Sequence, residues 1–232
     1  MEEIARAFRA QGNPQHAASQ KAYLKSQWAF HGVNVPCMRA EAKAFRKRHP
    51  DIDIRPLVDE AWRSDYHDLR TVSIELLVLY RKTLTAADVP WLESILRQCP
   101  NWDHVDHLCT KVLGPMLSDG LLERRTVNCW AKDDTFWVRR AALLVQLPAL
   151  SKGGGDFAWF SRLAVPMLQE KEFFIRKVIG WVLREVSKKR PALVSEFLEK
   201  HLSDVSGVTF REAVKYLPDH DRLRARWRPH PG

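Results

Sequence analysis

The sequence lacks the features that mark membrane and secreted proteins. No apolar run among its 232 residues is long enough to span a bilayer, so a membrane-spanning helix is not expected. The opening residues, MEEIARAFRA, are acidic and contain no uninterrupted apolar core, so no secretory signal is expected either. We therefore expect a soluble, cytoplasmic protein that has no membrane partner.

Cysteine is scarce, and its spacing does not suggest a metal site. The four cysteines form no C-x-x-C pair, which argues against a structural zinc site; they are Cys37, Cys99, Cys109 and Cys129. In a reducing compartment they need not form disulfides. We interpret them as small core residues.

Positive charge and tryptophan, in contrast, are abundant. The formal net charge is +9, and there are nine tryptophans. A basic surface attracts polyanions, of which nucleic acid is the commonest, and indole rings can stack on bases or sugars. The alternative is a basic surface that is merely solvated, with several of the tryptophans in the core.

Apolar residues recur with helical spacing along almost the whole chain. The segments TVSIELLVLY, RRAALLVQL and IRKVIGWVLREV place them three and four residues apart, and no strict alternation predicts strands. Prolines fall between these segments and indicate helix boundaries. The stretch SKGGGD, at 151–156, predicts a loop. With 45% hydrophobic residues the chain can bury a sizeable core.

A weak internal repeat organises these helices. FWVRRAALLVQL, FFIRKVIGWVL and VTFREAVKYL each place a basic residue after apolar or aromatic positions, namely Arg139, Arg176 and Arg211. Arg70 lies two such periods before Arg139. A helical period of roughly 35–45 residues indicates HEAT-like or armadillo-like helix pairs. We predict an all-α, right-handed superhelical solenoid forming a single domain, whose concave basic face binds DNA. The alternative is that the basic residues merely flank helices.

The ten residues NWDHVDHLCT carry the densest chemistry. On a helix, Trp102 and Asp106 lie four residues apart and border a buried stripe formed by Val105, Leu108, Cys109 and Val112. Asp103, His104 and His107 point toward the polar side. These three, with Cys109, could contribute to a metal site, but no second ligand cluster is evident. We expect solvated histidines and no metal; a metallohydrolase is the weakest alternative.

Two side chains on later helices also stand out. Arg140 lies between Trp137 and Leu144, an apolar setting in which a guanidinium needs an anion. That anion is either an internal carboxylate or a phosphate of a ligand. Trp181 projects away from the core face of its own helix, among charged residues. It either packs against a neighbouring repeat or meets a ligand.

These segments resemble the AlkD family of bacterial alkylpurine DNA glycosylases, which are built from HEAT-like repeats. The resemblance runs nearly end to end, through NWDHVDHL, FWVRRAALLVQL, KEFFIRKVIGWVLRE and REAVKYL, with HGVNVPCMR near the beginning. It implies that Asp106 is the catalytic aspartate. It also implies that Trp102 and Trp181 flank the lesion nucleotide.

The same resemblance implies contacts with DNA elsewhere in the chain. Arg140 would contact the DNA backbone near the lesion, and Tyr23 and Arg39 would be N-terminal DNA contacts. The sequence departs from the family pattern at Asn101, where the best-known member has another tryptophan. Two histidines, at 104 and 107, replace small polar residues. These departures bear on substrate preference.

The implied activity is that of a monofunctional DNA glycosylase without a cofactor. It would hydrolyse the N-glycosidic bond of cationic N3- or N7-alkylated purines in duplex DNA without enclosing a flipped base. No lysine is placed with the site residues, so a Schiff-base lyase step is not suggested. One alternative is a bacterial self-resistance glycosylase specialised for bulky minor-groove N3-adenine adducts. Another is a non-catalytic DNA- or protein-binding scaffold. We expect a monomer that works on the nucleoid.

The end of the chain, residues 218–232, is basic. Its arginines are Arg222, Arg224, Arg226 and Arg228. The segment either adds affinity for DNA or is a disordered, solubilising tail.

Overall fold

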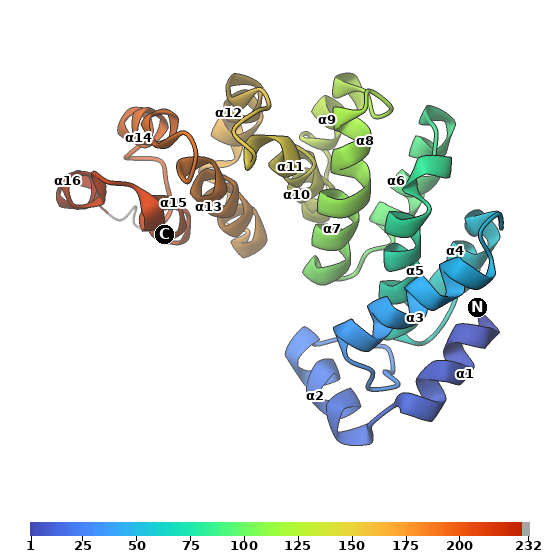
Figure 1. Ribbon diagram of the computed structural model, residues 1–232. Helices are drawn as coiled ribbons and strands as arrows, with labels where there is room; N and C mark the ends of the chain where they lie inside the picture. Colours follow the sequence, from blue (N-terminus) through green and yellow to red (C-terminus); the bar gives the residue numbers. More distant parts are fainter. Residues whose placement is uncertain (229–232) are drawn as a thin grey trace. The chain divides into compact units, whose positions relative to one another are not determined.

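A computed structural model describes residues 1–228, and it is built from helices (Figure 1). Within these residues the single extended pairing is an isolated β-bridge between Ala29 and Tyr66. The predicted all-helical repeat fold is confirmed. The handedness of the superhelix and its basic concave face stay predictions. Where the sequence predicts one domain, the chain divides into two compact units, Met1–Leu108 and Cys109–Gly232.

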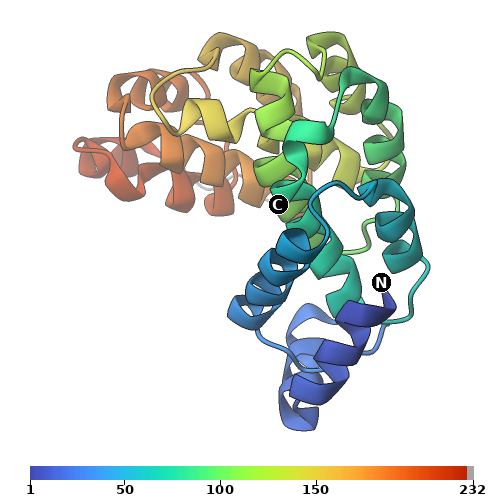
Figure 2. The ribbon, with the colours of Figure 1, turned by 45° about the vertical axis from the view of Figure 1, so that its right-hand side comes forward.

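The first unit is organised around one central helix. Its elements are α1 (Glu2–Gln11), α2 (Pro14–Leu24), α3 (Val35–Arg48), α4 (Ile54–Trp62), α5 (His67–Leu79), η1 (Arg81–Thr83), η2 (Ala86–Asp88), α6 (Val89–Arg97) and α7 (Trp102–Leu108). Helices α3 and α4 both pack along α5, as the blue and teal ribbons of Figure 2 show. Helix α7 packs on α5 as well. Consequently α5 is buried at most of its positions.

Short polar residues and prolines set the beginnings of the early helices. The Asn13 side chain accepts a hydrogen bond from the His16 N–H at 3.0 Å, and that of Asn34 accepts one from the Cys37 N–H at 2.9 Å. Proline occupies the first turn of α2 and α3, where a missing N–H loses no helical partner. The interpretation of Pro36 as a helix boundary is confirmed.

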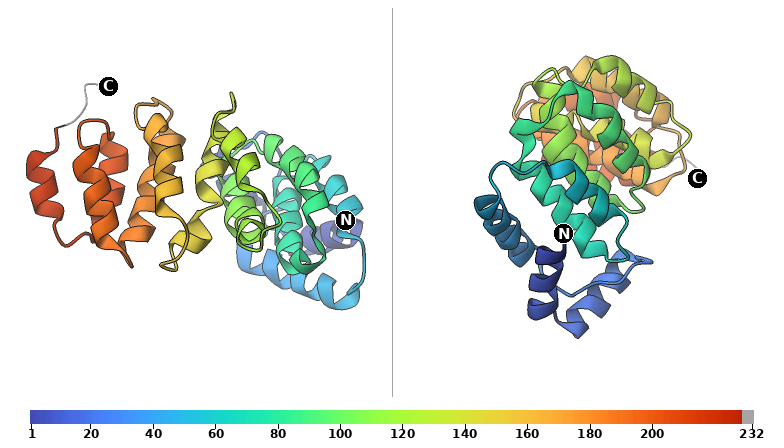
Figure 3. Two further views of the ribbon diagram at one scale, coloured as in Figure 1. Left: turned by 90° about the horizontal axis from the view of Figure 1, so that it is seen from above. Right: turned by 90° about the vertical axis from the view of Figure 1, so that its right-hand side faces the viewer.

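The second unit consists of two rows of helices. Its elements are η3 (Cys109–Leu113), α8 (Gly114–Ser118), α9 (Arg124–Trp130), α10 (Phe136–Leu144), α11 (Leu147–Leu150), α12 (Phe157–Ala164), η4 (Val165–Met167), α13 (Phe173–Ser187), α14 (Pro191–Lys200), α15 (Gly207–Ala213), η5 (Val214–Tyr216) and α16 (His220–Arg226). Helices α10, α13 and α15 pack on one another in succession, with α9, α12 and α14 in the row beside them (Figures 1 and 3). The predicted loop SKGGGD is confirmed between α11 and α12.

Elements α7, η3 and α8 form one continuous helical run, and the division between the units falls inside it. The η3 segment is a turn of π-helix. Pro115 lies in the first turn of α8, just after η3 ends. A proline has no N–H to donate to the backbone carbonyl one helical turn earlier. The proline ring also conflicts with the carbonyl four residues earlier, so the wider π turn has a local cause.

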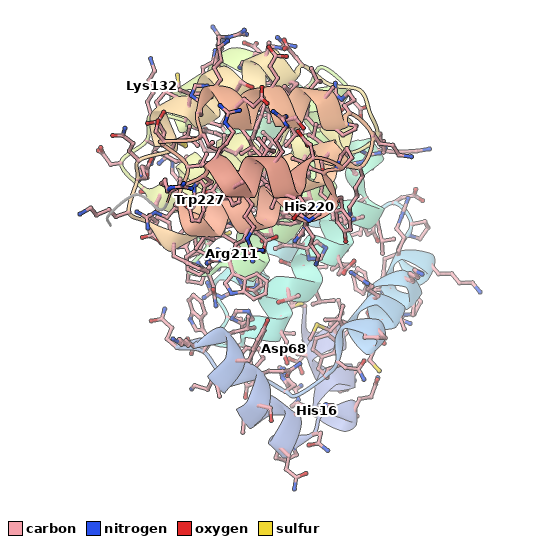
Figure 4. All side chains as sticks on the ribbon, turned by 90° about the vertical axis from the view of Figure 1, so that its left-hand side faces the viewer. His16, Asp68, Lys132, Arg211, His220 and Trp227 are labelled. Atoms are coloured by element: carbon pink, nitrogen blue, oxygen red, sulfur yellow. The ribbon has the colours of Figure 1, made fainter. Side chains whose placement is uncertain are left out.

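The basic end of the chain is folded as far as the structure describes it. Helix α16 buries Leu223 fully, and Trp227 stacks on Phe210 with ring centroids 4.7 Å apart. Trp227 and Arg211, both labelled in Figure 4, lie near Gly207, where an added Cβ would be 3.6 Å from the Trp227 ring and 3.2 Å from Arg211 Nη1. These contacts give the segment a helix and a packed tryptophan as far as the structure describes it, and its contribution to DNA affinity stays a prediction. Residues 229–232 of the predicted tail lie outside the described residues.

The interpretation of the cysteines as core residues holds only in part. Cys99 and Cys109 are buried, as predicted, but Cys129 is exposed and is not a core residue. All four cysteines are free thiols.

Between residues 1 and 228, no helix has both the length and the apolar character needed to cross a bilayer.

Candidate active site

Helix α7 carries the two residues on which the functional expectation rests. Trp102 is its first residue, and Asp106 follows one turn later on the same side. Both are half-buried, whereas Val105 and Leu108 are fully buried. The prediction that Trp102 and Asp106 border the buried stripe is confirmed.

An exposed tyrosine lies against Trp102. The rings of Tyr23 and Trp102 meet edge to face, with centroids 6.1 Å apart and planes at 86°. Tyr23 is 74% exposed, so most of its surface stays open to solvent beside Trp102. The side chain of Asn101 donates a hydrogen bond to the Leu24 carbonyl, which ties the end of α2 to the beginning of α7. The structure therefore brings Tyr23 and Trp102 together as an aromatic pair.

A buried glutamate on α5 connects two other candidate residues. The Arg39 Nε donates to Glu75 Oε1 at 2.7 Å, and His107 Nε2 lies 3.5 Å from the same oxygen. Glu75 is only 8% exposed, while the Arg39 side chain is 54% exposed. Glu75 was missed by the sequence reasoning. Its signal was a single carboxylate inside the otherwise apolar segment IELLVLY.

The expectation of solvated histidines on α7 is wrong for His104. This residue is fully buried, its ring stacks on that of His67 with centroids 4.2 Å apart, and its Nε2 lies 3.0 Å from Thr71 Oγ1. Burial lowers the pKa of His104 to about 3, so the imidazole is neutral near neutral pH. His104 precedes Leu108 by one turn and extends the buried face rather than the polar one.

Asp103 is not solvated surface either, because it accepts a hydrogen bond from a buried histidine. His67 Nε2 lies 2.7 Å from Asp103 Oδ2, and His67 Nδ1 lies 2.9 Å from Ser26 Oγ. Burial alone would raise the pKa of Asp103, but the bond from His67 and the adjacent His104 lower it overall. This network anchors α7 to α5 and to the segment after α2. It thereby fixes the rotation of the helix that presents Trp102.

In the second unit, the predicted desolvated setting of Arg140 is confirmed. Arg140 is 3% exposed, and its Nη1 donates to the Phe174 carbonyl at 2.6 Å. Its guanidinium carbon lies 5.9 Å from the centroid of the Phe174 ring, which also packs against Trp137. Arg140 is therefore held in a fixed position between α10 and α13.

Trp181 is half-buried on α13, and ion pairs flank it on its own helix. Lys177 and Arg184 both bond to the carboxylate of Glu212 on α15. Burial would raise the pKa of Glu212, but the hydrogen bond from Lys177 and the charge of Arg184 lower it overall. The predicted charged surroundings of Trp181 are thus present, and Glu212 offsets part of their positive charge.

The recurring arginines make the same internal contact in three repeats. Each donates to a backbone carbonyl six residues earlier, at distances between 2.6 and 3.2 Å; the pairs are Arg70 with Ser64, Arg139 with Asp133 and Arg176 with Glu170. The contact clamps the turn that precedes each helix. This gives a structural reason for the repeat. The predicted DNA contacts of Arg139 and Arg176 stay predictions.

Two of these positions differ in detail. Arg139 also makes a two-pronged ion pair with Glu170, through Nε at 3.1 Å and Nη2 at 2.8 Å. Arg211 is exposed, and the carbonyl six residues before it, that of Val205, accepts a hydrogen bond from Trp227 Nε1 at 3.3 Å. Arg211 is therefore the least enclosed of the recurring arginines, and its predicted DNA contact also stays a prediction.

The candidate residues fall into two sets, one in each unit. The first unit holds the aromatic pair, Asp106 on the same helix, and Arg39 on the Glu75 carboxylate. The second unit holds Arg140, Trp181 and three of the recurring arginines. Each set belongs to a helical-repeat unit in which buried polar groups and ion pairs fix the position of partly exposed aromatic and charged side chains. These features define the protein as a helical-repeat protein, and its similarity to known proteins supports this class.

Residues 4–217 match the family model described as DNA alkylation repair enzyme. The chain belongs to this family, whose AlkD type is the one predicted from the sequence. It is similar in structure to a predicted DNA alkylation repair enzyme from Enterococcus faecalis, with a TM-score of 0.79 and 27% identity. That match covers 89% of this chain and 97% of the other. No curated protein matches the chain by sequence.

Two further solved structures share the fold at lower identity. AlkD2 from Streptococcus mutans aligns with a TM-score of 0.60 and 18% identity, over 80% of this chain and 91% of that one. The protein smu.31 from Streptococcus mutans UA159 aligns with a TM-score of 0.59 and 18% identity, over 79% of this chain and 92% of that one. These likenesses show the helical-repeat fold, and the family match indicates a role in DNA repair.

Proposed function

We propose that the protein is a monofunctional DNA glycosylase that releases cationic N3- or N7-alkylated purines from duplex DNA, with Asp106 as the catalytic carboxylate. The observation that carries the proposal is the placement of Asp106. It lies half-buried, one turn after Trp102, on a helix whose rotation is fixed by buried hydrogen bonds. A carboxylate held in this way can act on a sugar without reorganising first.

The proposed reaction follows from the charge on the lesion. Alkylation at N3 or N7 makes the purine cationic, so the C1′–N bond breaks with its electron pair leaving on a neutral base. The sugar then develops an oxocarbenium-like positive charge. A carboxylate beside C1′ stabilises that charge, and it can orient the attacking water and accept its proton. Asp106 is assigned this role.

The aromatic side chains are assigned to the sugar and its neighbours. The faces of indole rings carry negative electrostatic potential and favour an adjacent developing cation. Trp102 and Trp181 are proposed to contact the lesion nucleotide, and Tyr23 is proposed to contact the adjoining backbone. Such contacts require no pocket around the base, so the enzyme would accept lesions without enclosing a flipped base.

The basic residues are assigned to the phosphates. Arg140 can bind one phosphate oxygen in a fixed register, because its guanidinium is held on the Phe174 carbonyl. Arg39 is more than half exposed and lies on Glu75, so it can exchange part of that ion pair for a phosphate. Arg211 is exposed and is assigned a peripheral phosphate contact. A monomer bound to double-stranded DNA needs no further partner for this chemistry.

The test is a side-by-side excision assay with purified wild-type protein. Duplexes containing 7-methylguanine, 3-methyladenine or a bulky minor-groove N3-adenine adduct are incubated under single-turnover conditions, and the released base is measured. Release of the methylated purines supports a general repair enzyme. Strong preference for the bulky adduct supports the self-resistance alternative. Binding without release from any of the three duplexes would leave the non-catalytic scaffold and refute the proposal.

A further inference from the structure

A cluster of metal-ligating side chains lies between α5 and α7. His67 comes from α5, and Asp103 and His104 come from α7, and each offers one ligand atom. These three atoms all lie within 4.8 Å of one another. We propose that His67, Asp103 and His104 form a binding site for a divalent transition metal ion of the zinc class.

The candidate ligand atoms of the cluster lie close together. His67 Nε2 lies 2.7 Å from Asp103 Oδ2, and His104 Nε2 lies 3.9 Å from the same oxygen. The two imidazole rings are stacked with their planes 23° apart, so their in-plane lone pairs run side by side and one ring must turn before both can bind the same ion. A zinc ion lies about 2 Å from each of its ligand atoms, so the distances it requires between two ligand atoms differ only slightly from these. A three-ligand site therefore forms when the His104 ring turns out of the stack and its Nε2 exchanges Thr71 Oγ1 for the ion.

A second observation points independently to a missing partner. Asp103 Oδ1 and His104 Nδ1 are both buried and, within residues 1–228, have no hydrogen-bond partner. Burying an unpaired carboxylate oxygen or imidazole nitrogen costs about 1–3 kcal/mol, so natural proteins rarely leave two in one place. An ion bound by both carboxylate oxygens of Asp103 would compensate the unpaired Oδ1, whereas His104 would bind through Nε2 and its Nδ1 would stay as it is.

The surroundings of His67 match those of a metal ligand. Its Nδ1 lies 2.9 Å from Ser26 Oγ, and that hydroxyl also accepts a hydrogen bond from the Trp28 N–H at 3.2 Å. When an ion takes Nε2, the proton on that nitrogen moves to Nδ1, and Ser26 Oγ accepts it. Such an outer hydrogen bond fixes the tautomer and the ring direction of most ligating histidines.

The ligand types select the class of ion. Two imidazoles and one carboxylate suit zinc, cobalt, nickel or iron, whereas magnesium and calcium prefer oxygen ligands alone. The guanidinium of Arg70 is close enough to disfavour extra positive charge at His104. We therefore expect affinity below that of structural zinc sites with four protein ligands. Bound there, the ion would join α5 to the helix that presents Trp102 and Asp106.

The test uses untagged, full-length protein that has been stripped with a chelator and then titrated with Co²⁺ or Zn²⁺. We expect one equivalent to bind, with a visible absorption band for Co²⁺ and a rise in Tm for Zn²⁺. His104→Ala and Asp103→Asn should weaken binding more than about tenfold, and Ser26→Ala should weaken it by about tenfold. His220→Ala removes an exposed histidine and should bind like the wild type.

A crystal of the wild-type protein soaked in Zn²⁺ keeps the proposal testable if a variant does not fold. An anomalous-scattering peak between His67, Asp103 and His104 supports the site. Peaks only at surface histidines, no bound equivalent, or binding unchanged in the cluster variants would overturn it. These readouts need no DNA, so their failure is distinct from failure of the proposed glycosylase activity.

Discussion

The two helices that carry the candidate tryptophans are held in place by different physics. Helix α7 is anchored to α5 by two buried hydrogen bonds, one between Asp103 and His67 and the other between His104 and Thr71. Helix α13 is anchored by close backbone contact with α15 and by ion pairs to the Glu212 carboxylate, which is partly exposed. Buried hydrogen bonds are little affected by salt, whereas exposed ion pairs are screened by it.

The difference indicates which helix needs the more exact position. A buried, directional network fixes the rotation of α7, and Asp106 is proposed to act on a bond that tolerates little misplacement. The ion pairs of α13 can slide or exchange partners, which suits a helix proposed to follow a DNA backbone. Four perturbations, taken in decreasing order of their expected effect, test whether the two helices are held in these different ways.

The largest effect is expected from Gly180→Ala on α13. A Cβ at this position would lie 2.7 Å from Glu212 Cβ and 2.9 Å from the Thr209 carbonyl oxygen, so α15 must shift. We expect a loss of about 2–3 kcal/mol in the free energy of unfolding of the second unit, although alanine normally favours a helix by about 1 kcal/mol. Urea unfolding measures the change.

Gly154→Ala provides the matched control. Its added Cβ would lie 3.6 Å from the Ala149 carbonyl oxygen, an ordinary contact in a loop. We expect that variant to unfold like the wild type. Equal effects of the two substitutions would show that close approach at Gly180 does not support α13.

The next effect is a pH dependence confined to the first unit. The pKa of His104 is lowered by burial to about 3 from an ordinary 6.5, so between these values the unfolded chain takes up a proton that the folded chain does not. Acid therefore favours unfolding, and lowering the pH from about 7 to about 5 should cost about 2 kcal/mol. The pKa of Glu212 is also lowered, but this carboxylate reduces the stability of the second unit only as the pH falls below about 4.5, its ordinary pKa.

Hydrogen exchange read by mass spectrometry can follow each unit separately. As the pH is lowered over this range, the backbone amides of α5 and α7 should lose protection from exchange, while those of α13 and α15 should keep it. In His104→Asn the extra loss in the first unit should disappear, since asparagine does not titrate. Parallel losses in both units of the wild type would contradict the account.

A smaller effect is expected from Asn101→Ala. This change removes the hydrogen bond from the Asn101 side chain to the Leu24 carbonyl, for a loss of about 1 kcal/mol. The end of α2 should exchange its amide hydrogens faster, and Tyr23 should lose its fixed contact with Trp102. Unchanged exchange over 20–26 would mean that other contacts hold the aromatic pair.

The smallest effect is expected from Glu212→Gln. Lys177 and Arg184 lose a charged partner that is itself partly exposed, so the free energy of unfolding should fall by less than about 1 kcal/mol. The difference from the wild type should shrink as salt is added, because exposed charges are screened. A large, salt-independent loss would show that α13 is anchored in the same manner as α7.

The sequence predicts the helical fold well because helical periodicity is local information. The loop at 151–156 and the phase of the recurring arginines also follow from local pattern. The role of those arginines does not, because Arg139 and Arg176 donate to carbonyls in turns whose path depends on tertiary packing. The expectation of a positive groove was drawn from spacing alone.

The candidate site was predicted in part for a similar reason. The border position of Trp102 and Asp106 follows from one helix considered by itself. The burial of His104 does not, because its partner His67 lies on another helix, 37 residues earlier in the chain. Glu75 was missed for the same reason, since its contacts with Arg39 and His107 join three helices.

The most direct test of the central claim compares wild-type protein with Asp106→Asn on duplex DNA containing 7-methylguanine or 3-methyladenine. The account predicts single-turnover excision by the wild type and a fall of at least about a hundredfold in the variant, with DNA affinity unchanged. Asp221→Asn, on a side chain that is 90% exposed, should excise like the wild type. Excision by Asp106→Asn at the wild-type rate would contradict the assignment of the catalytic carboxylate.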